Sequence, residues 1–279
     1  GRWSRNNFNN SLRSLSGLFF CLEKDGLRSI ITSFMSGHSH YATIKRQKES
    51  KDAAKGNVFS KLARAITIAA KAGPDPDSNF KLRVEIDRAR ASNMPKENIE
   101  RALRSAQDKQ DLEEMEYEGF GPGGIAVIVN VATDNKNRTA QEIKNLFERA
   151  GGSLAGPGAV SFNFEPKGFM LLEKSSDPES QMLQLIDLGV EDVEEKEDGI
   201  EVYTAPDKLG EIRKKLEEAG FVIKETELYM KPKTPLAITD PNTASKAMNF
   251  LNLLEEHEDV QKVYTNLNIS EDLVSQLKS

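Results

Sequence analysis

The feature that most limits the fold is a change of hydrophobic period near residue 115, from a helical pattern to one in which strands and helices alternate. Over residues 168–230 this second pattern reads strand, helix, strand, strand, helix, strand, which is the split βαβ or ferredoxin-like motif. Its first strand is expected at 169–172, and Asp198-Gly199 is typical of a tight turn between the two central strands. The chain is therefore predicted to belong to the α+β class.

The segments on both sides of this motif predict a second, similar sandwich. Residues 115–166 read strand, helix, strand, with the two strands expected at 125–131 and 160–164. Residues 237–266 add a helix and a strand. The proline-rich run 231–235 is expected to be extended, because a residue that precedes proline avoids the helical region. We therefore expect two ferredoxin-like α/β sandwich domains, with the third domain of the chain inserted in the second.

Before residue 112 the pattern is helical and predicts a domain of three helices. Apolar residues share one helix face at spacings of four, four and three: Val58, Leu62, Ile66 and Ala69. Gly73-Pro74 should end this helix, and Pro95 should open a later one, because the missing N–H of proline is harmless in a first turn. Residues 80–91 alternate in a way that would also suit a strand, but their flanking residues favour a helix.

These patterns divide the chain into four predicted parts. They are an N-terminal extension (1–34), a basic helical domain (35–112), an α/β domain in two pieces (113–166 and 237–279) and an inserted ferredoxin-like domain (167–236).

Two interpretations of the extension stay open. It resembles a mitochondrial transit peptide in its arginine and serine content, but Glu23 and Asp25 argue against this, because such peptides are poor in acidic residues. We prefer the other interpretation, a non-native segment upstream of a start at Met35. In either case we expect the extension to be disordered.

Charge is distributed unevenly along the chain. The formal net charge is -6, yet residues 37–110 carry 16 basic and nine acidic side chains, net +7, whereas residues 111–279 carry 17 basic and 33 acidic, net -16. A basic module joined to an acidic body predicts a nucleic-acid partner, DNA or RNA, for the basic part and suits a protein partner for the acidic part. An ordinary solvated surface remains the alternative. Apolar runs stay well short of the roughly 20 residues of a membrane span, so we expect no membrane partner.

The cations are densest between residues 37 and 55, a segment that we call the basic arm. Its cations fall within eleven residues and follow one aromatic residue, Tyr41; they are Lys45, Arg46, Lys48, Lys51 and Lys55. Cations neutralise phosphates with release of counterions, and an aromatic ring can stack on an exposed base. These six residues, together with Lys61 and Arg64 on the following helix, are the candidate nucleic-acid-binding residues. A charged helix face with Tyr41 in a core is the competing interpretation.

A glycine-rich segment, residues 119–124, matches the spacing G-x-G-x-x-G. In a dinucleotide site this loop follows a strand and opens a helix, whereas here it opens a strand, so no helix dipole would face a phosphate. We therefore interpret its glycines as a tight structural turn: Gly119, Gly121, Gly123 and Gly124. An enzyme that uses this loop is the weakest of the functional alternatives.

The sequence gives little support for a metal site or a catalytic site. His38 and His40 have no third ligand nearby in the sequence, and the single cysteine, Cys21, excludes a cysteine zinc site. Neither a Ser-His-Asp pattern nor a phosphate-binding loop is recognisable. We therefore expect no metal, no cofactor and no enzymatic activity.

Several motifs resemble the YebC/PmpR family. The most specific are Tyr-Glu-Gly-Phe-Gly-Pro-Gly-Gly at 117–124 and Asp-Asn-Lys-Asn-Arg-Thr at 134–139, and the segments 35–45 and 93–95 add to them. The resemblance extends from about residue 35 to about residue 270. The usual family opening has Lys and Trp where this chain has His40 and Tyr41, which keeps an aromatic ring but removes one charge.

The resemblance implies a helical N-terminal domain and two α/β domains, the third inserted in the second, without enzymatic activity. Bacterial members are described as cytoplasmic transcriptional regulators that bind DNA. Others, including a mitochondrial branch that activates translation of cytochrome oxidase, act at the ribosome. We therefore expect a cytoplasmic, nucleic-acid-binding regulator of gene expression. Two alternatives stay open: a ribosome-associated translation factor that binds RNA, and a mitochondrial location if residues 1–34 are a transit peptide.

Overall fold

The computed structural model describes residues 55–106, 112–270 and 273, without the side chains of 55–57. The interpretations of the extension and of the basic arm up to residue 54 therefore lie outside the described residues. In the described segments, no helix combines the length and the apolar character that crossing a membrane requires.

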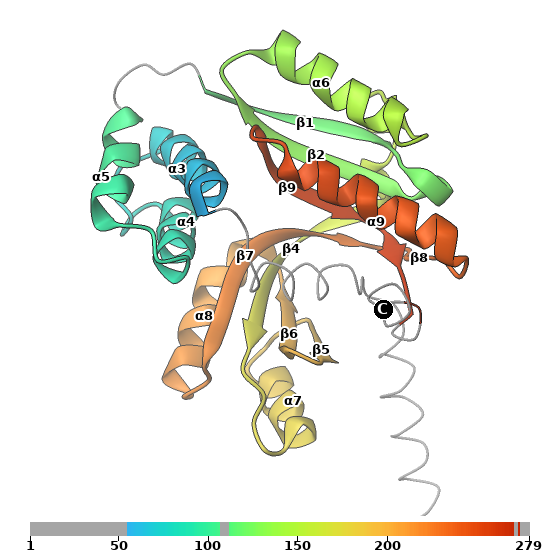
Figure 1. Cartoon of the computed structure of the whole chain (residues 1–279). Helices are drawn as coiled ribbons and strands as arrows, with labels where there is room; N and C mark the ends of the chain where they lie inside the picture. The colour runs from blue at the N-terminus through green and yellow to red at the C-terminus, as the bar shows by residue number, and fades with distance from the viewer. Residues whose placement is uncertain (1–54, 107–111, 271–272, 274–279) are drawn as a thin grey trace, which may run out of the picture. The chain divides into compact units, whose positions relative to one another are not determined.

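Three helices precede residue 107 in the described part of the chain (Figure 1). They are α3 (Lys55–Lys71), α4 (Phe80–Ala91) and α5 (Lys96–Ser105). Their apolar faces meet in one core that includes Ile66, Leu82 and Ile99. Asn79 caps α4, because its side-chain oxygen accepts the N–H of Leu82 at 3.1 Å while its amide donates to two carbonyls at the end of α3. The three predicted helices are thus confirmed, including the one at 80–91.

The first sheet has four strands in the order β3-β1-β2-β9. The strands are β1 (Glu113–Phe120), β2 (Ala126–Thr133), β3 (Ser153–Ala155) and β9 (Val260–Thr265). Two helices, α6 (Lys136–Arg149) and α9 (Pro241–Glu256), cover one face of this sheet (Figure 1). Phe147 of α6 meets Phe250 of α9 edge to face, with ring centroids 4.9 Å apart. This core joins residues that precede the second sheet in the chain, such as Phe147, with residues that follow it, such as Phe250.

The second sheet has the order β5-β6-β4-β7 and is formed entirely between β3 and α9. Its strands are β4 (Phe164–Leu172), β5 (Asp192–Lys196), β6 (Gly199–Thr204) and β7 (Ile223–Pro232). The helices α7 (Pro178–Asp187) and α8 (Leu209–Glu218) pack on one face, around Met170, Leu185 and Leu209. This is the ferredoxin-like unit predicted from the sequence, and it is inserted in the chain of the first sheet. Two further short strands form a parallel pair: β8 (Leu236–Ala237), which follows β7 in the chain, and β10 (Leu267–Asn268), which follows β9.

The two sheets share one arrangement with a different chain order. In the second sheet β4 and β6 are central, and in the first sheet β2 and β1 take the same two positions with the same antiparallel pairing. The strand that corresponds to β6 is β1, which precedes the rest of its sheet in the chain. The first sandwich is therefore a ferredoxin-like unit whose third strand lies at the start of its chain, and the second sheet is inserted between β3 and α9, where that strand would otherwise stand.

Two details of the sequence prediction are wrong. The strand expected at 160–164 is absent: residues 161–163 form a short 3-10 turn, and β4 is one continuous strand from Phe164 that includes the 169–172 stretch. The N–H groups of Val160 and Ser161 donate to the Glu118 carboxylate, at 2.7 and 2.8 Å, instead of to a neighbouring strand. In addition, β1 was not predicted, because four of its eight residues are glutamates, which are uncommon in strands.

Candidate functional site

Most of the candidate nucleic-acid-binding residues lie outside the described residues: Tyr41, Lys45, Arg46, Lys48 and Lys51. Lys55 is the first residue of α3, but its side chain is not described. The structure places the remaining two, Lys61 and Arg64, on α3, three residues apart. The Lys61 side chain reaches the last turn of α9, and the Arg64 side chain reaches the turn that joins α9 to β9.

The Lys61 ammonium group donates to the backbone carbonyl of Glu255, in the last turn of α9. Arg64 continues this contact: its Nη1 donates to the carbonyl of Glu258 at 3.1 Å and, more weakly, to that of Ala132 at 3.4 Å. Carbonyl groups at a helix C-terminus carry partial negative charge and favour a nearby cation. Lys61 is therefore placed where the end of α9 attracts a cation, whereas the carbonyls that Arg64 reaches lie after α9 and on β2.

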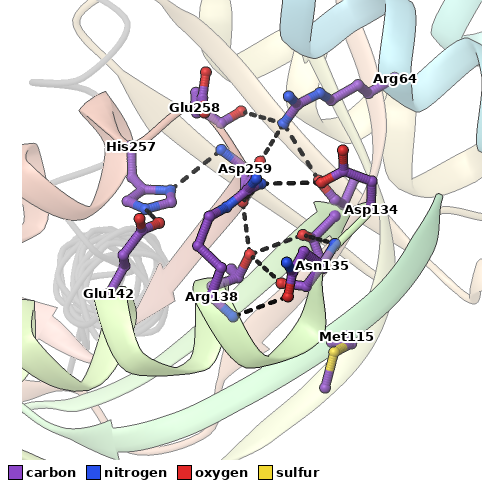
Figure 2. Close-up of polar contacts among 12 residues, drawn as sticks. Arg64, Met115, Asp134, Asn135, Arg138, Glu142, His257, Glu258 and Asp259 are labelled. Atoms are coloured by element: carbon purple, nitrogen blue, oxygen red, sulfur yellow. Dashed lines mark hydrogen bonds and ion pairs between the residues drawn. The ribbon is translucent and has the colours of Figure 1, made fainter.

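Asp259 is the centre of the contact that Arg64 makes (Figure 2). Its side chain is fully buried, with one oxygen 2.5 Å from Arg64 Nη1 and the other 3.1 Å from Arg138 Nη2. Thr139 also donates its hydroxyl to the second oxygen at 2.6 Å. Burial alone would raise the pKa of Asp259, but hydrogen bonds from Thr139, Arg138 and Arg64 outweigh it and hold the pKa below its ordinary value.

The motif at 134–139 supplies two of these partners. Asn135 caps α6 by accepting the N–H of Arg138 at 3.1 Å, and Asp134 pairs with the Arg138 side chain at 3.0 Å. The cap fixes the first turn of α6, from which Arg138 faces Asp259 (Figure 2) and Thr139 donates to the same carboxylate. Asp259 itself was missed, because it lies 120 residues further along the chain and has no local motif.

His257 and Glu142 lie beside this cluster, and with Asp259 they place three potential metal-binding atoms within 4.8 Å of one another. His257 Nε2 lies 2.9 Å from Glu142 Oε2, and its Nδ1 accepts the backbone N–H of Asp259 at 3.2 Å. Both ring nitrogens are thus engaged. The Asp259 oxygens face the guanidinium groups of Arg64 and Arg138, which would repel a dication. The donor set therefore fits an ion-pair network better than a metal site.

The other cations of the helical part differ in their pairing. Arg83, Arg88 and Arg90 lie 3.3, 2.9 and 3.5 Å from carboxylates of the same part. In contrast, Arg101 and Arg104 are exposed on α5, and no carboxylate within the described segments forms an ion pair with them. Sequence reasoning had not singled out these two arginines.

The glycine-rich segment forms the turn between β1 and β2. Gly121 donates its N–H to the carbonyl of Ile125 at 2.8 Å, and Gly124 donates to that of Gly121 at 3.0 Å. Gly123 has a φ of 78°, and a Cβ there would lie 2.8 Å from both Ile238 and Thr243. Gly119 and Gly121 are crowded instead, since added Cβ atoms would meet Phe147 and Phe250 at 2.5 and 2.7 Å. The turn is packed against the helices and opens a strand.

Glu118 is a second buried carboxylate that the sequence did not reveal. It accepts three backbone N–H groups from the segment that leads into the inserted sheet, those of Gly158, Val160 and Ser161, at 2.6 to 2.8 Å. Burial would raise its pKa, but these hydrogen bonds outweigh burial, and the pKa is lowered. The carboxylate therefore holds the crossover between the two sheets.

Two models of known protein families together match nearly all the described residues. Residues 39–109 match the model of the TACO1/YebC protein N-terminal domain, and residues 112–267 match that of the TACO1/YebC second and third domain. A "probable transcriptional regulatory protein" of Moorella thermoacetica is 44% identical over 250 residues, which cover 87% of this chain and 99% of that protein. One from Thermotoga maritima is also 44% identical, over 251 residues that cover 88% of this chain and 98% of that protein.

A solved structure agrees with these matches. The crystal structure of a conserved hypothetical protein from Aquifex aeolicus superposes with a TM-score of 0.74 at 41% identity and covers 79% of this chain and 93% of that one. The mixed helical and sheet architecture is thus that of a solved relative, and the resemblance stated from the motifs is confirmed. The chain belongs to the TACO1/YebC family.

Proposed function

We propose that this protein is a non-enzymatic regulator of gene expression that binds nucleic acid through its basic helical part. The observation that carries the proposal is the charge division, net +7 over residues 37–110 and net -16 over residues 111–279. It is supported by the relatives from Moorella and Thermotoga, each named a probable transcriptional regulatory protein. Cytoplasmic action fits this role, and mitochondrial action is the alternative if residues 1–34 are a transit peptide.

The proposed contacts are phosphate contacts made by the basic arm and the start of α3. The arm residues Lys45, Arg46, Lys48 and Lys51 lead directly into α3, which begins at Lys55 and carries Lys61 and Arg64. Clustered cations bind phosphates without reading the sequence, and Tyr41 adds a ring for stacking on an unpaired base. The acidic sheets would repel nucleic acid and suit a protein partner instead.

The second candidate function is a translation factor that binds RNA at the ribosome. The pairing on α4 favours it, because Arg83, Arg88 and Arg90 each lie near a carboxylate of the helical part. A helix that reads bases in the DNA major groove needs polar side chains that are available to the base edges. Arg88 is also the least available of the three, since its side chain is only 30% exposed.

One experiment separates the two functions. The purified protein is sedimented through a sucrose gradient with cell lysate, once at low salt and once at high salt. A translation factor should migrate with ribosomal particles and leave them at high salt, because its phosphate contacts release counterions. A DNA-binding regulator should stay near the top of the gradient in both samples and bind duplex DNA. Binding to neither ribosomes, RNA nor duplex DNA would contradict the proposal.

A further inference from the structure

Lys61 and Arg64, two of the proposed phosphate-binding cations, are the same residues that attach α3 to the α9–β9 turn. Lys61 donates to the Glu255 carbonyl. Arg64 donates to Glu258 and pairs with Asp259 (Figure 2). We call this set of contacts the α3 latch. The Arg64 side chain is 22% exposed, so one edge of the latch reaches the surface.

The latch offers these cations the same chemistry as a nucleic-acid backbone. Its acceptors are backbone carbonyls, one of them in the last turn of α9, and one carboxylate, that is, partial or full negative charges held in fixed positions. A phosphate is likewise an anionic acceptor for arginine and lysine. Arg64 makes all its described contacts through Nη1, so a phosphate that took this nitrogen would displace Asp259 and the backbone carbonyls from it.

The latch can also open without leaving a buried charge unpaired. When Arg64 leaves, Asp259 keeps the guanidinium of Arg138 at 3.1 Å and the hydroxyl of Thr139 at 2.6 Å. An isolated buried carboxylate would be strongly unfavourable, whereas one with a cation and a hydroxyl is satisfied. Asp259 is therefore suited to two states, one with Arg64 and one without it.

We propose that the α3 latch competes with nucleic acid for Lys61 and Arg64, so that binding releases α3 from the α9–β9 turn. This inference rests on the proposed function and adds its regulation. Because the two equilibria are linked, weakening the latch must tighten nucleic-acid binding, and nucleic acid must open the latch.

The first test measures the affinity for single-stranded polyuridine RNA of the wild type, Asp259→Asn and a matched control, Asp187→Asn. Asp187 is exposed on α7, so its variant makes the same change of charge away from the latch. We expect Asp259→Asn to bind at least about five-fold more tightly than Asp187→Asn, the lower end of usual coupling between sites. Equal affinities of the two variants would overturn the latch.

The second test does not depend on the folding of Asp259→Asn. In the full chain with Cys21→Ser, fluorescent labels are placed at Ser78→Cys, between α3 and α4, and at Lys144→Cys on α6; both sites are exposed. Saturating polyuridine RNA should change the energy transfer between them. Unchanged transfer with RNA bound would overturn the latch alone. Failure of every variant to bind RNA or duplex DNA would overturn the proposed function, and the latch with it.

Discussion

The glycines of the β1–β2 turn differ in what restricts them. Gly123 and Gly124 both have a positive φ, 78° and 79°, a backbone conformation that residues other than glycine rarely adopt. A Cβ at Gly123 would also lie 2.8 Å from Ile238 and Thr243, whereas a Cβ at Gly124 would meet nothing within 4 Å. The pair therefore separates the effect of backbone strain from that of crowding.

Gly123→Ala should destabilise the protein by more than about 1 kcal/mol, because strain and a clash act together. Gly124→Ala should be less destabilising, since only the strain remains. Urea denaturation of both variants measures the free energy of unfolding. If Gly123→Ala were as stable as the wild type but lost a saturable binding of ATP or NAD, the turn would be a nucleotide site and the structural interpretation would be wrong.

Glu118 predicts how stability depends on pH. Its pKa is lower in the folded chain than in the unfolded chain, so its ionisation stabilises the fold above the ordinary glutamate pKa of about 4.3. That contribution is lost as the pH falls through the lowered folded value. In Glu118→Gln it is absent at every pH, and the NH2 group that replaces one carboxylate oxygen faces N–H donors that this oxygen accepts.

We therefore expect Glu118→Gln to be less stable than the wild type by about 1–3 kcal/mol at neutral pH. The difference should shrink as the pH falls below about 4.3, because only the wild type loses the contribution of this carboxylate. Urea denaturation over a pH series checks this. Two curves that stay parallel to low pH would show that the carboxylate is not responsible.

At the scale of helices and strands, sequence patterns predicted those elements that are determined by residues close together in the chain. Asn79, Asn135 and the apolar stripe of α3 mark helix starts and faces within a few residues, and these helices were predicted. In contrast, β1 is stabilised by its two neighbouring strands and by Met115 and Tyr117, which pack on the core, while its glutamates suggested a solvated segment.

The same reasoning explains the candidate site. The cap at Asn135 could be predicted, since it depends on residues three positions apart. The partners of Arg64 and of Glu118 could not, because they lie 195 and about 40 residues away and have no spacing that a motif would capture. The environments of the buried carboxylates thus depend on the tertiary fold. From the sequence, only arginines and glycines around them could be identified as candidate residues.

We predict that the segment containing the second sheet folds independently of the first sheet. Residues 164–232 contain all four strands of their sheet and a core of their own around Met170, Ile200 and Leu209. The fragment should therefore unfold cooperatively by circular dichroism. The matched fragment 112–163 should not, because β9 and α9, which complete its sheet and core, come after the insertion. A cooperative transition in the second fragment alone would contradict this division.

At the scale of the whole molecule, the proposed nucleic-acid binding belongs to residues 37–110, net +7, of a chain whose residues 111–279 are net -16. The acidic part cannot supply phosphate contacts without overcoming its own repulsion, so affinity should concentrate in the basic arm. Lys45 and Lys48 are the most suitable positions for a test, since charge reversal there removes two contacts and adds local repulsion.

The most direct test is a titration of single-stranded RNA and duplex DNA at several salt concentrations. It compares the wild type, the pair Lys45→Glu with Lys48→Glu, and a control pair, Lys144→Glu with Lys214→Glu. The control residues are exposed on α6 and α8, and the change of net charge is the same. Fluorescence anisotropy of a labelled probe gives the affinities.

We predict that the arm pair weakens binding to every probe sequence at least about ten-fold more than the control pair. It also predicts that the RNA salt slope falls by about 1.4, since each single-strand contact contributes about 0.7. Preference among sequences should not change, because phosphate contacts carry no sequence information. If the arm pair and the control pair bound equally well, the basic arm would be solvated surface and would not be the nucleic-acid-binding element.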